Sequence, residues 1–173
     1  MKTEDRLKNY PRHDSMRGEF GYYLYLGMAM DPNIILLVGD LGYKLFDCHR
    51  EDMENQFINV GASEQAMIGV ASGLALSGKT PVCYSITPFL IYRGFEGIRN
   101  YINREKLNVK LVGSGIDKDY AHDGPSHWAE DIYYFMDGFA SFSKYYPDEK
   151  AEIADMVKEI IISKNPCFVG LRR

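Results

Sequence analysis

Two carboxylates and a loop rich in histidine and aspartate are the residues whose types and spacing allow chemistry. Asp40 directly follows the apolar run 34–38, and Glu64 stands at the start of an apolar segment. Between Asp119 and Trp128 the sequence holds two His and two Asp within ten residues. Polar groups that converge on a loop are better candidates for binding or catalysis than residues of a core.

Each of these signals also has a purely structural interpretation. Asp40 is in a good place for a turn, and Asp123-Gly124-Pro125 is typical turn chemistry. An acidic residue in the first turn of a helix, as at Glu64, normally complements the helix dipole. The segment from Ser85 to Arg93, rich in aromatic and apolar groups, either stacks on a ring ligand or enters a core. The loop 119–128 matches no strong zinc motif, so no metal site is predicted in this chain.

The elements that must position these residues follow from hydrophobic periodicity. Ser15 caps an expected helix over 16–30, and Gly78 is expected just past the end of another. Several apolar runs do not alternate, which is typical of strands buried on both faces of a parallel sheet. The fold class is therefore α/β, a doubly wound and mainly parallel sheet with helices on both faces, and ligands bind beyond the carboxyl ends of its strands. Strands are expected at 34–38, 57–60, 81–86, 109–112, 142–146 and 167–171, and further helices at 63–77, 89–104, 129–136 and 148–164.

Length and charge narrow the class of protein. The 173 residues predict an arm over 1–14 and one domain over 15–173. The net charge of −4, without a basic stripe, argues against nucleic acid as a partner. No apolar run approaches a membrane span, and the polar start predicts no secretory signal, so a cytoplasmic location is expected. Cys83 and Cys167 lie in apolar strand-like runs and are expected to pack in the core.

The order of the motifs resembles the pyrimidine-binding, central domain of the transketolase family. The segment GASEQAMIGVASGLA, starting at Gly61, resembles the family pattern G-x-x-E-Q-x-M-x-G-x-A-x-G-L-A. DGPSH from Asp123, followed by EDI from Glu130, resembles D-G-P-T-H-x-x-x-E-D-I. Shorter matches begin at Met16, Gly39, Phe89 and Asn165, so the resemblance covers nearly all of residues 16–173.

The resemblance implies a thiamine-diphosphate-binding fold that supplies only half of a cofactor site. The chain lacks the G-D-G…N signature that binds the diphosphate and its metal in this family. The sequence is therefore identified as a separate, C-terminal-type subunit of a split transketolase-like enzyme, inactive alone. A second subunit would hold the diphosphate with Mg²⁺ or Ca²⁺, and an α2β2 heterotetramer is expected.

The resemblance also implies roles for individual residues. Glu64 would hydrogen-bond N1′ of the aminopyrimidine and so promote loss of the C2 proton of the thiazolium, for which its carboxyl group must hold a proton. His127 is the second expected catalytic residue, and it would meet the reacting end of the substrate. The remaining expected contacts are Ile86, Phe89 and Tyr92 at the pyrimidine, Asp40 and Leu41 at the cofactor, and Arg17, Lys44 and Asp123 at the substrate.

Phosphate recognition departs from the family pattern. Arg17 matches a family phosphate contact, whereas Gly115 stands where a family His contacts phosphate. Near Tyr146 an Arg of the family pattern is missing, and Lys44 is expected to compensate electrostatically. An unusual or unphosphorylated sugar is therefore expected as the donor or acceptor.

The expected activity is transfer of a two-carbon ketol unit between a ketose and an aldose sugar, in carbohydrate metabolism. Two alternatives stay open: a subunit of a thiamine-diphosphate-dependent 2-oxo-acid decarboxylase or synthase, and a non-catalytic scaffold of the same fold. The segment from Asp123 to His127 favours ketol transfer, and retention of Glu64 with Phe89 argues against a scaffold.

Overall fold

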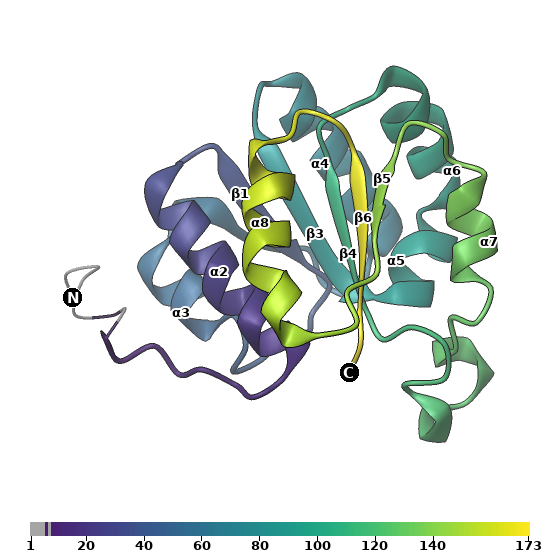
Figure 1. Ribbon diagram of the computed structural model, residues 1–173. Coiled ribbons are helices and arrows are strands. Elements are labelled where there is room, and N and C mark those ends of the chain that lie inside the picture. Colours follow the sequence, from purple (N-terminus) through teal and green to yellow (C-terminus); the bar gives the residue numbers. More distant parts are fainter. Residues whose placement is uncertain (1–5, 7) are drawn as a thin grey trace.

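One parallel sheet organises the part of the chain that the structure describes, residue 6 and residues 8–173. In this computed structural model six strands pair in the order β2-β1-β3-β4-β6-β5 (Figure 1). Every strand pair is parallel, so all carboxyl ends meet at one edge, where the C-terminus lies in Figure 1. The strands are β1 (Ile34–Val38), β2 (Phe57–Asn59), β3 (Thr80–Ile86), β4 (Lys110–Ser114), β5 (Ser143–Tyr145) and β6 (Cys167–Leu171).

Helices cover both faces of this sheet, which confirms the predicted doubly wound α/β fold. On one face α2 (Met16–Met30) lies beside α8 (Ile153–Ile162) (Figure 1). The other face carries α4, α5, α6 and α7, whose bounds are Glu64–Leu76, Thr87–Arg93, Phe95–Gly97 and Ile132–Asp137. Two further segments are α3 (Asp47–Asp52) and the π-helical turn Ile98–Asn103.

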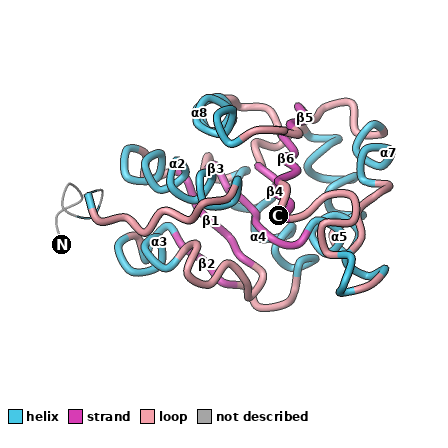
Figure 2. The backbone as a smooth tube through the Cα atoms, turned by 60° about the horizontal axis from the view of Figure 1, so that its bottom comes forward, coloured by secondary structure: helices cyan, strands magenta, loops and turns pink. Residues whose placement is uncertain are grey.

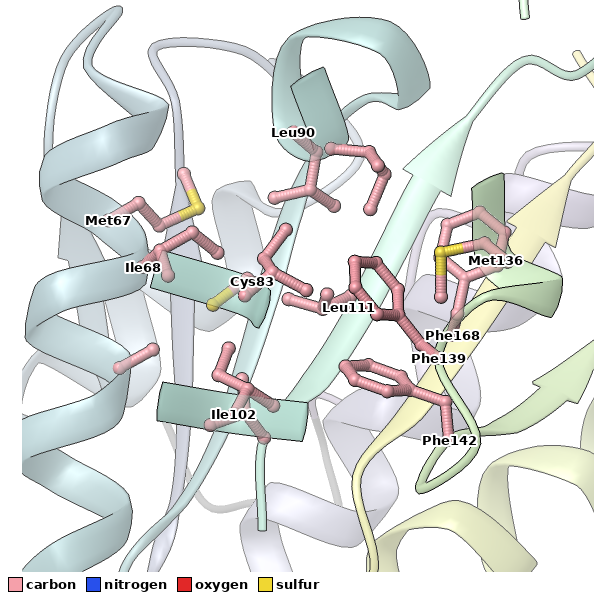
Figure 3. Packing of buried hydrophobic residues seen from close by; sticks show 14 of the residues in the cluster. Met67, Ile68, Cys83, Leu90, Ile102, Leu111, Met136, Phe139, Phe142 and Phe168 are labelled. Atoms are coloured by element: carbon pink, nitrogen blue, oxygen red, sulfur yellow. The ribbon is translucent and has the colours of Figure 1, made fainter. Parts of the chain in front are cut away.

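The core between the sheet and α4 fixes the helix that begins at Glu64. Met67 and Ile68 of α4 pack in one buried cluster with Cys83 and Leu111 of the sheet (Figure 3). Burial of such a side chain contributes about 1.5–3 kcal/mol. Cys83 is completely buried in this cluster, as its apolar strand context predicts.

Several helix boundaries differ from the sequence expectation. The helix expected over 89–104 begins at Thr87, because Pro88 fits the first turn, where its missing N–H is no loss. α3 was not expected, because its polar sequence DCHRED carries no apolar periodicity. The helix expected from Asp148 begins at Ile153 after a 3₁₀ turn at Lys150–Glu152.

His49, on α3, is a fully buried histidine surrounded by the rings of Tyr10, Tyr25 and Phe46. Burial lowers the pKa of His49 to about 3, and the nearby Gly21 backbone and Asp52 charge oppose this shift only in part. His49 therefore takes up a proton near pH 6.5 in the unfolded chain, whereas in the folded chain it stays neutral at that pH.

The free energy of unfolding is expected to fall as the pH falls, because of His49. Between pH 7 and pH 5, uptake of the His49 proton by the unfolded state lowers the free energy of unfolding by about 2 kcal/mol. His49→Phe should remove that part of the pH dependence, whereas the exposed His122→Asn should leave it. Urea unfolding of the three proteins at both pH values checks this, and an equal pH slope for His49→Phe and the unaltered chain would contradict it.

Candidate active site

The tip of β3 directs side chains to two sides of the sheet, because successive residues of a strand point to opposite faces. Ser85 faces α4 and donates a hydrogen bond to Glu64. Tyr84 and Ile86 face the other way and line a cleft beneath the start of α2. The carboxyl end of β3 therefore separates a buried carboxylate from an open cleft.

Glu64 is buried at the N-terminus of α4, with only 2% of its surface exposed. Its Oε1 accepts a hydrogen bond from Ser85 Oγ at 2.8 Å, and its Oε2 accepts one from Arg93 Nη1 at 2.7 Å. Gly39, at the end of β1, lies beside the carboxylate, and a Cβ atom there would come within 3.2 Å of Oε1. A side chain at Gly39 would therefore press on the carboxyl group and on its neighbours Met67 and Ser85.

The electrostatics of Glu64 favour the carboxylate in this chain alone. Burial raises the pKa of Glu64, but the hydrogen bonds from Arg93 and Ser85, the first backbone N–H of the helix and the Arg93 charge outweigh it. The pKa of Glu64 is therefore lowered. The resemblance requires Glu64 to hold a proton. The surroundings of Glu64 must therefore change before its carboxyl group is protonated.

One guanidinium and two rings extend the site from Glu64. The Arg93 guanidinium lies 3.9 Å from the centroid of the Phe89 ring, on α5. The His127 ring meets Phe89 edge to face, with centroids 4.8 Å apart. The structure thus brings together Glu64, Phe89 and His127, three of the predicted site residues.

A cleft of about 410 Å³ opens on the other side of the β3 tip. It collects four further predicted residues, Arg17, Leu41, Lys44 and Ile86. Arg17 donates a hydrogen bond to the Tyr120 hydroxyl, which is also bonded to Ser114 at 2.8 Å. The cleft is lined by His13, Asp14, Ser15, Arg17, Leu41, Gly42, Tyr43, Lys44, Leu45, Tyr84, Ile86, Ser114 and Tyr120.

Tyr120 occupies the space that a side chain at position 115 would take. Gly115 has a φ of +79°, and a Cβ atom there would lie 2.3 Å from the Tyr120 ring. Gly115, which stands where the family has a histidine, therefore makes room for the ring of Tyr120, a residue that lines the cleft.

Gly115→Ala is expected to destabilise the chain by about 1–3 kcal/mol more than Gly78→Ala. Both glycines have positive φ, but nothing in the described chain lies within 4 Å of a Cβ at Gly78. The difference between the two variants isolates the collision with Tyr120. Thermal or urea unfolding measures it, and equal losses of stability would show that the Tyr120 ring moves aside without cost.

Three predicted residues make their contacts elsewhere. Asp40 is exposed, with φ +56°, and accepts hydrogen bonds from Tyr43 and Asn59. Tyr92 points toward α7, where its hydroxyl donates to Asp131 and its ring packs on Phe135. Asp123 is exposed and lies 3.1 Å from His122. The structure does not bring these three side chains to Glu64 or into the cleft.

Sequence reasoning did not assign the partners of the predicted residues. Ser85 and Arg93 lie at the two ends of the candidate segment 85–93, and Tyr120 lies in the candidate loop 119–128, but no role was predicted for any of the three. The signal available for Ser85 was its place at the carboxyl end of a buried strand, two residues before Thr87, where α5 begins.

Neither a metal site nor a membrane span is found in the part of the chain that the structure describes. Residue 6 and residues 8–173 contain no group of three or more His, Cys, Asp or Glu placed to hold a metal ion. Within the same residues, none of the helices is both long and apolar enough to cross a bilayer.

The fold and the sequence motifs are those of a known family. The family model "Transketolase, pyrimidine binding domain" matches residues 15–173. The chain belongs to this family, as its sequence motifs predict.

Relatives in this family include separate subunits. The chain is 32% identical over 164 residues to a putative transketolase C-terminal section of Methanocaldococcus jannaschii, covering 93% of this chain and 51% of that protein. It is 30% identical to a 6-deoxy-6-sulfo-D-fructose transketolase subunit of Clostridium sp., covering 83% and 45%. The chain thus spans about half the length of the curated relatives it matches.

A solved structure described as a split gene transketolase, inactive beta4 tetramer, is similar to this fold. Its TM-score is 0.81 at 28% identity, over 92% of this chain and 51% of that one. The likeness confirms the fold class and supports the predicted split-subunit type.

Proposed function

We propose that this chain is the pyrimidine-binding subunit of a thiamine-diphosphate-dependent, transketolase-like enzyme that transfers a two-carbon ketol unit between sugars. A second subunit is proposed to hold the diphosphate and its Mg²⁺ or Ca²⁺, in an α2β2 assembly. The observation that carries the proposal is the buried Glu64, held between Ser85 and Arg93 at the carboxyl edge of the sheet. The split relatives support a partner subunit for this chain.

The residues at this edge fit an aminopyrimidine. Glu64 offers a buried carboxyl group to a ring nitrogen, and Phe89 offers an aromatic ring. When bound, thiamine diphosphate supplies the carbanion chemistry of the reaction, while the protein positions and polarises it. Glu64 would hold a proton at one carboxyl oxygen, and Ser85 would orient that carboxyl group.

Arg93 must change its contacts for this to happen. In the chain alone its guanidinium covers one face of Phe89 and neutralises Glu64. The Arg93 side chain is 47% exposed, so it is able to turn toward solvent. Once Arg93 leaves, burial acts on Glu64 without its compensating charge and raises the pKa, which favours the protonated carboxyl group.

The second subunit is proposed to dock on the exposed face of α4, the helix that begins at Glu64. An exposed helix face is normally polar, but beyond Gln65 this one is apolar or small. Among described residues nothing lies within 4 Å of a Cβ built at Gly69 or Gly73, so another backbone is able to approach closely. The face is formed by Ala66, Gly69, Val70, Gly73 and Leu76.

Ketol transfer by the assembled complex tests the proposal. The chain is co-expressed with a chain that carries the G-D-G…N motif, and transfer is assayed with thiamine diphosphate and Mg²⁺ on a panel of ketose donors. We expect turnover from the complex and none from either chain alone. Turnover by this chain alone contradicts the split site, and an assembled complex that binds the cofactor but transfers nothing favours a scaffold.

A further inference from the structure

Asn59, the last residue of β2, stands between the two loops that flank Glu64. β2 is the edge strand of the sheet and lies next to β1 (Figure 2). Asn59 pairs with Val38 at the carboxyl ends of these two strands. The loop after Val38 begins with Gly39 and Asp40, and the loop after Asn59 leads to Glu64. A side chain at this position is therefore able to contact both loops.

The amide group of Asn59 bonds both loops at once. Its Oδ1 accepts hydrogen bonds from the backbone N–H groups of Asp40 and Gly61, each at 3.0 Å. Its Nδ2 donates to Oδ1 of the Asp40 carboxylate at 3.3 Å. Backbone N–H groups only donate, so these two bonds fix which way the amide faces. Asn59 thus connects the end of β1 with the turn that leads into α4.

The start of α4 is held from outside the helix. Ser63 occupies the N-cap position, but within the described chain its side chain makes no capping hydrogen bond. Gly61, two residues before it, has a φ of +72°, which only glycine adopts at little cost. The hydrogen bond from Gly61 N–H to Asn59 holds this turn. The direction in which the chain enters α4 at Glu64 therefore depends on Asn59.

The end of β1 lies directly against the carboxyl group of Glu64. A Cβ atom at Gly39 would come within 3.2 Å of Oε1. The next residue, Asp40, donates its backbone N–H to Asn59, which ties this part of the backbone to β2. Asn59 therefore holds the chain on two sides of Glu64, at the turn before it and at the β1 end beside it.

Asp40 is oriented by the same amide group. Its φ of +56° lies in the left-handed region, which is uncommon for a residue with a side chain. Its Oδ1 accepts hydrogen bonds from Tyr43 at 2.7 Å and from Asn59 at 3.3 Å. The bond from Tyr43, and after it the bond from Asn59, lowers the pKa of Asp40. Neither of these bonds uses Oδ2, so this oxygen is able to accept a bond from a group that binds at the sheet edge.

We propose that Asn59 is a positioning residue of the cofactor site, whose amide holds the Asp40 turn and the start of α4 in one arrangement, so that Asp40 and Glu64 are presented together. The identity of the ligand as thiamine diphosphate rests on the proposed function. The placement of the two loops by Asn59 is a property of the chain itself, so it is measurable without cofactor or second subunit.

Two variants of Asn59 separate its acceptor from its donor in the isolated chain. Asn59→Ala removes all three bonds, so amide hydrogen exchange at Asp40 and Gly61 should become faster. Asn59→Asp keeps an acceptor for both N–H groups, so exchange should stay near that of the unaltered chain. A ¹³C NMR titration should show a raised pKa of Asp40 in both variants, and the larger rise in Asn59→Asp, because like charges then lie side by side.

Binding of thiamine diphosphate to the assembled complex gives the second measurement. Isothermal titration in the presence of Mg²⁺ should show a Kd raised by about five- to tenfold in Asn59→Ala, the equivalent of about one lost hydrogen bond. The kcat for ketol transfer should fall by up to about 10²-fold, as expected when a reacting group is misplaced by about 1 Å. Asn59→Asp should also raise the Kd, because it displaces the Asp40 carboxylate.

Two controls show whether these effects pass through Asp40. In an Asp40→Ala background, Asn59→Asp should change the Kd no further, because the carboxylate that it repels is gone. Asn59→Ala should keep part of its effect there, through Gly61. Asn55→Asp places the same charge on an exposed position of the 3₁₀ turn before β2, and it should leave both the Asp40 pKa and the Kd unchanged.

Three results would overturn the inference. They are an unchanged Kd in Asn59→Ala, an Asp40 pKa that is the same in Asn59→Asp and the unaltered chain, and additive effects of Asn59→Asp and Asp40→Ala on the Kd. If Asn59→Ala fails to fold, Asn59→Asp decides, since it keeps the backbone bonds.

Failure of this inference and failure of the proposed function are distinguishable. Ketol transfer by a complex in which the Asn59 variants bind thiamine diphosphate normally refutes the inference alone. A complex that binds thiamine diphosphate with the expected Asn59 effects but transfers no ketol unit refutes the proposed function alone. If the complex binds no thiamine diphosphate, the proposed function and the positioning role both fail, even where the NMR measurements show the expected loop placement.

Discussion

Glu64→Gln is expected to lower turnover of the assembled enzyme by about 10²- to 10⁴-fold, the usual contribution of a positioned proton. The amide keeps the size of the side chain and is able to donate a hydrogen bond, but it cannot exchange a proton. The loss should appear mainly in kcat, because the cleft that contains Arg17 and Lys44, the predicted substrate contacts, lies on the other side of the β3 tip. Steady-state kinetics of the complex measures it.

A matched variant separates this effect from a general loss of charge. Glu96→Gln removes an exposed carboxylate from α6, close in sequence to Arg93, and should leave turnover within about twofold. Size-exclusion chromatography of each complex checks that the substitution leaves assembly unaffected. Equal turnover of Glu64→Gln and Glu96→Gln would refute the catalytic role of Glu64.

Gly73→Met is expected to prevent assembly with the second subunit and therefore to abolish turnover. The Met side chain has free space in the chain alone, since nothing in the described residues lies within 4 Å of a Cβ at Gly73. Its gain in helix propensity, about 0.8 kcal/mol, should leave the isolated chain at least as stable. At a close-packed interface the same side chain should raise the Kd for the second subunit by at least about 100-fold.

Two controls accompany this variant. Gly73→Ala adds only a methyl group and should weaken association far less. Lys158→Met places the same side chain on an exposed position of α8, away from α4, and should not affect association. Analytical ultracentrifugation with the second subunit measures all three, and normal association of Gly73→Met would show that the partner docks elsewhere.

The fold was predictable because its signals are local. The uninterrupted apolar run of β1 predicts a strand buried on both faces, and Ser15 caps α2 through its bond to Gly18 N at 3.0 Å. Gly78 has the positive φ of a residue just past a helix end. α3 could not be predicted, because a short polar helix is held by burial of Cys48 and His49 rather than by periodicity.

The sequence motifs pointed to three residues that the structure brings together, but not to their contacts. Glu64, Phe89 and His127 stand in recognisable motifs, and the structure brings them together. That Ser85 bonds Glu64 depends on the register between β3 and α4, which no local pattern specifies. Tyr92 illustrates the same limit, because its bond to Asp131 of a distant loop turns it away from Glu64.

The most direct test of the central role of Glu64 is the rate at which the C2 proton of thiamine diphosphate exchanges with deuterium in the assembled complex. Rapid mixing into D₂O, acid quench and ¹H NMR measure this rate without any sugar substrate. We predict exchange far faster than in the free cofactor and slowed by about 10²-fold or more in Glu64→Gln. Exchange at the wild-type rate in Glu64→Gln, with the cofactor bound, would contradict the account.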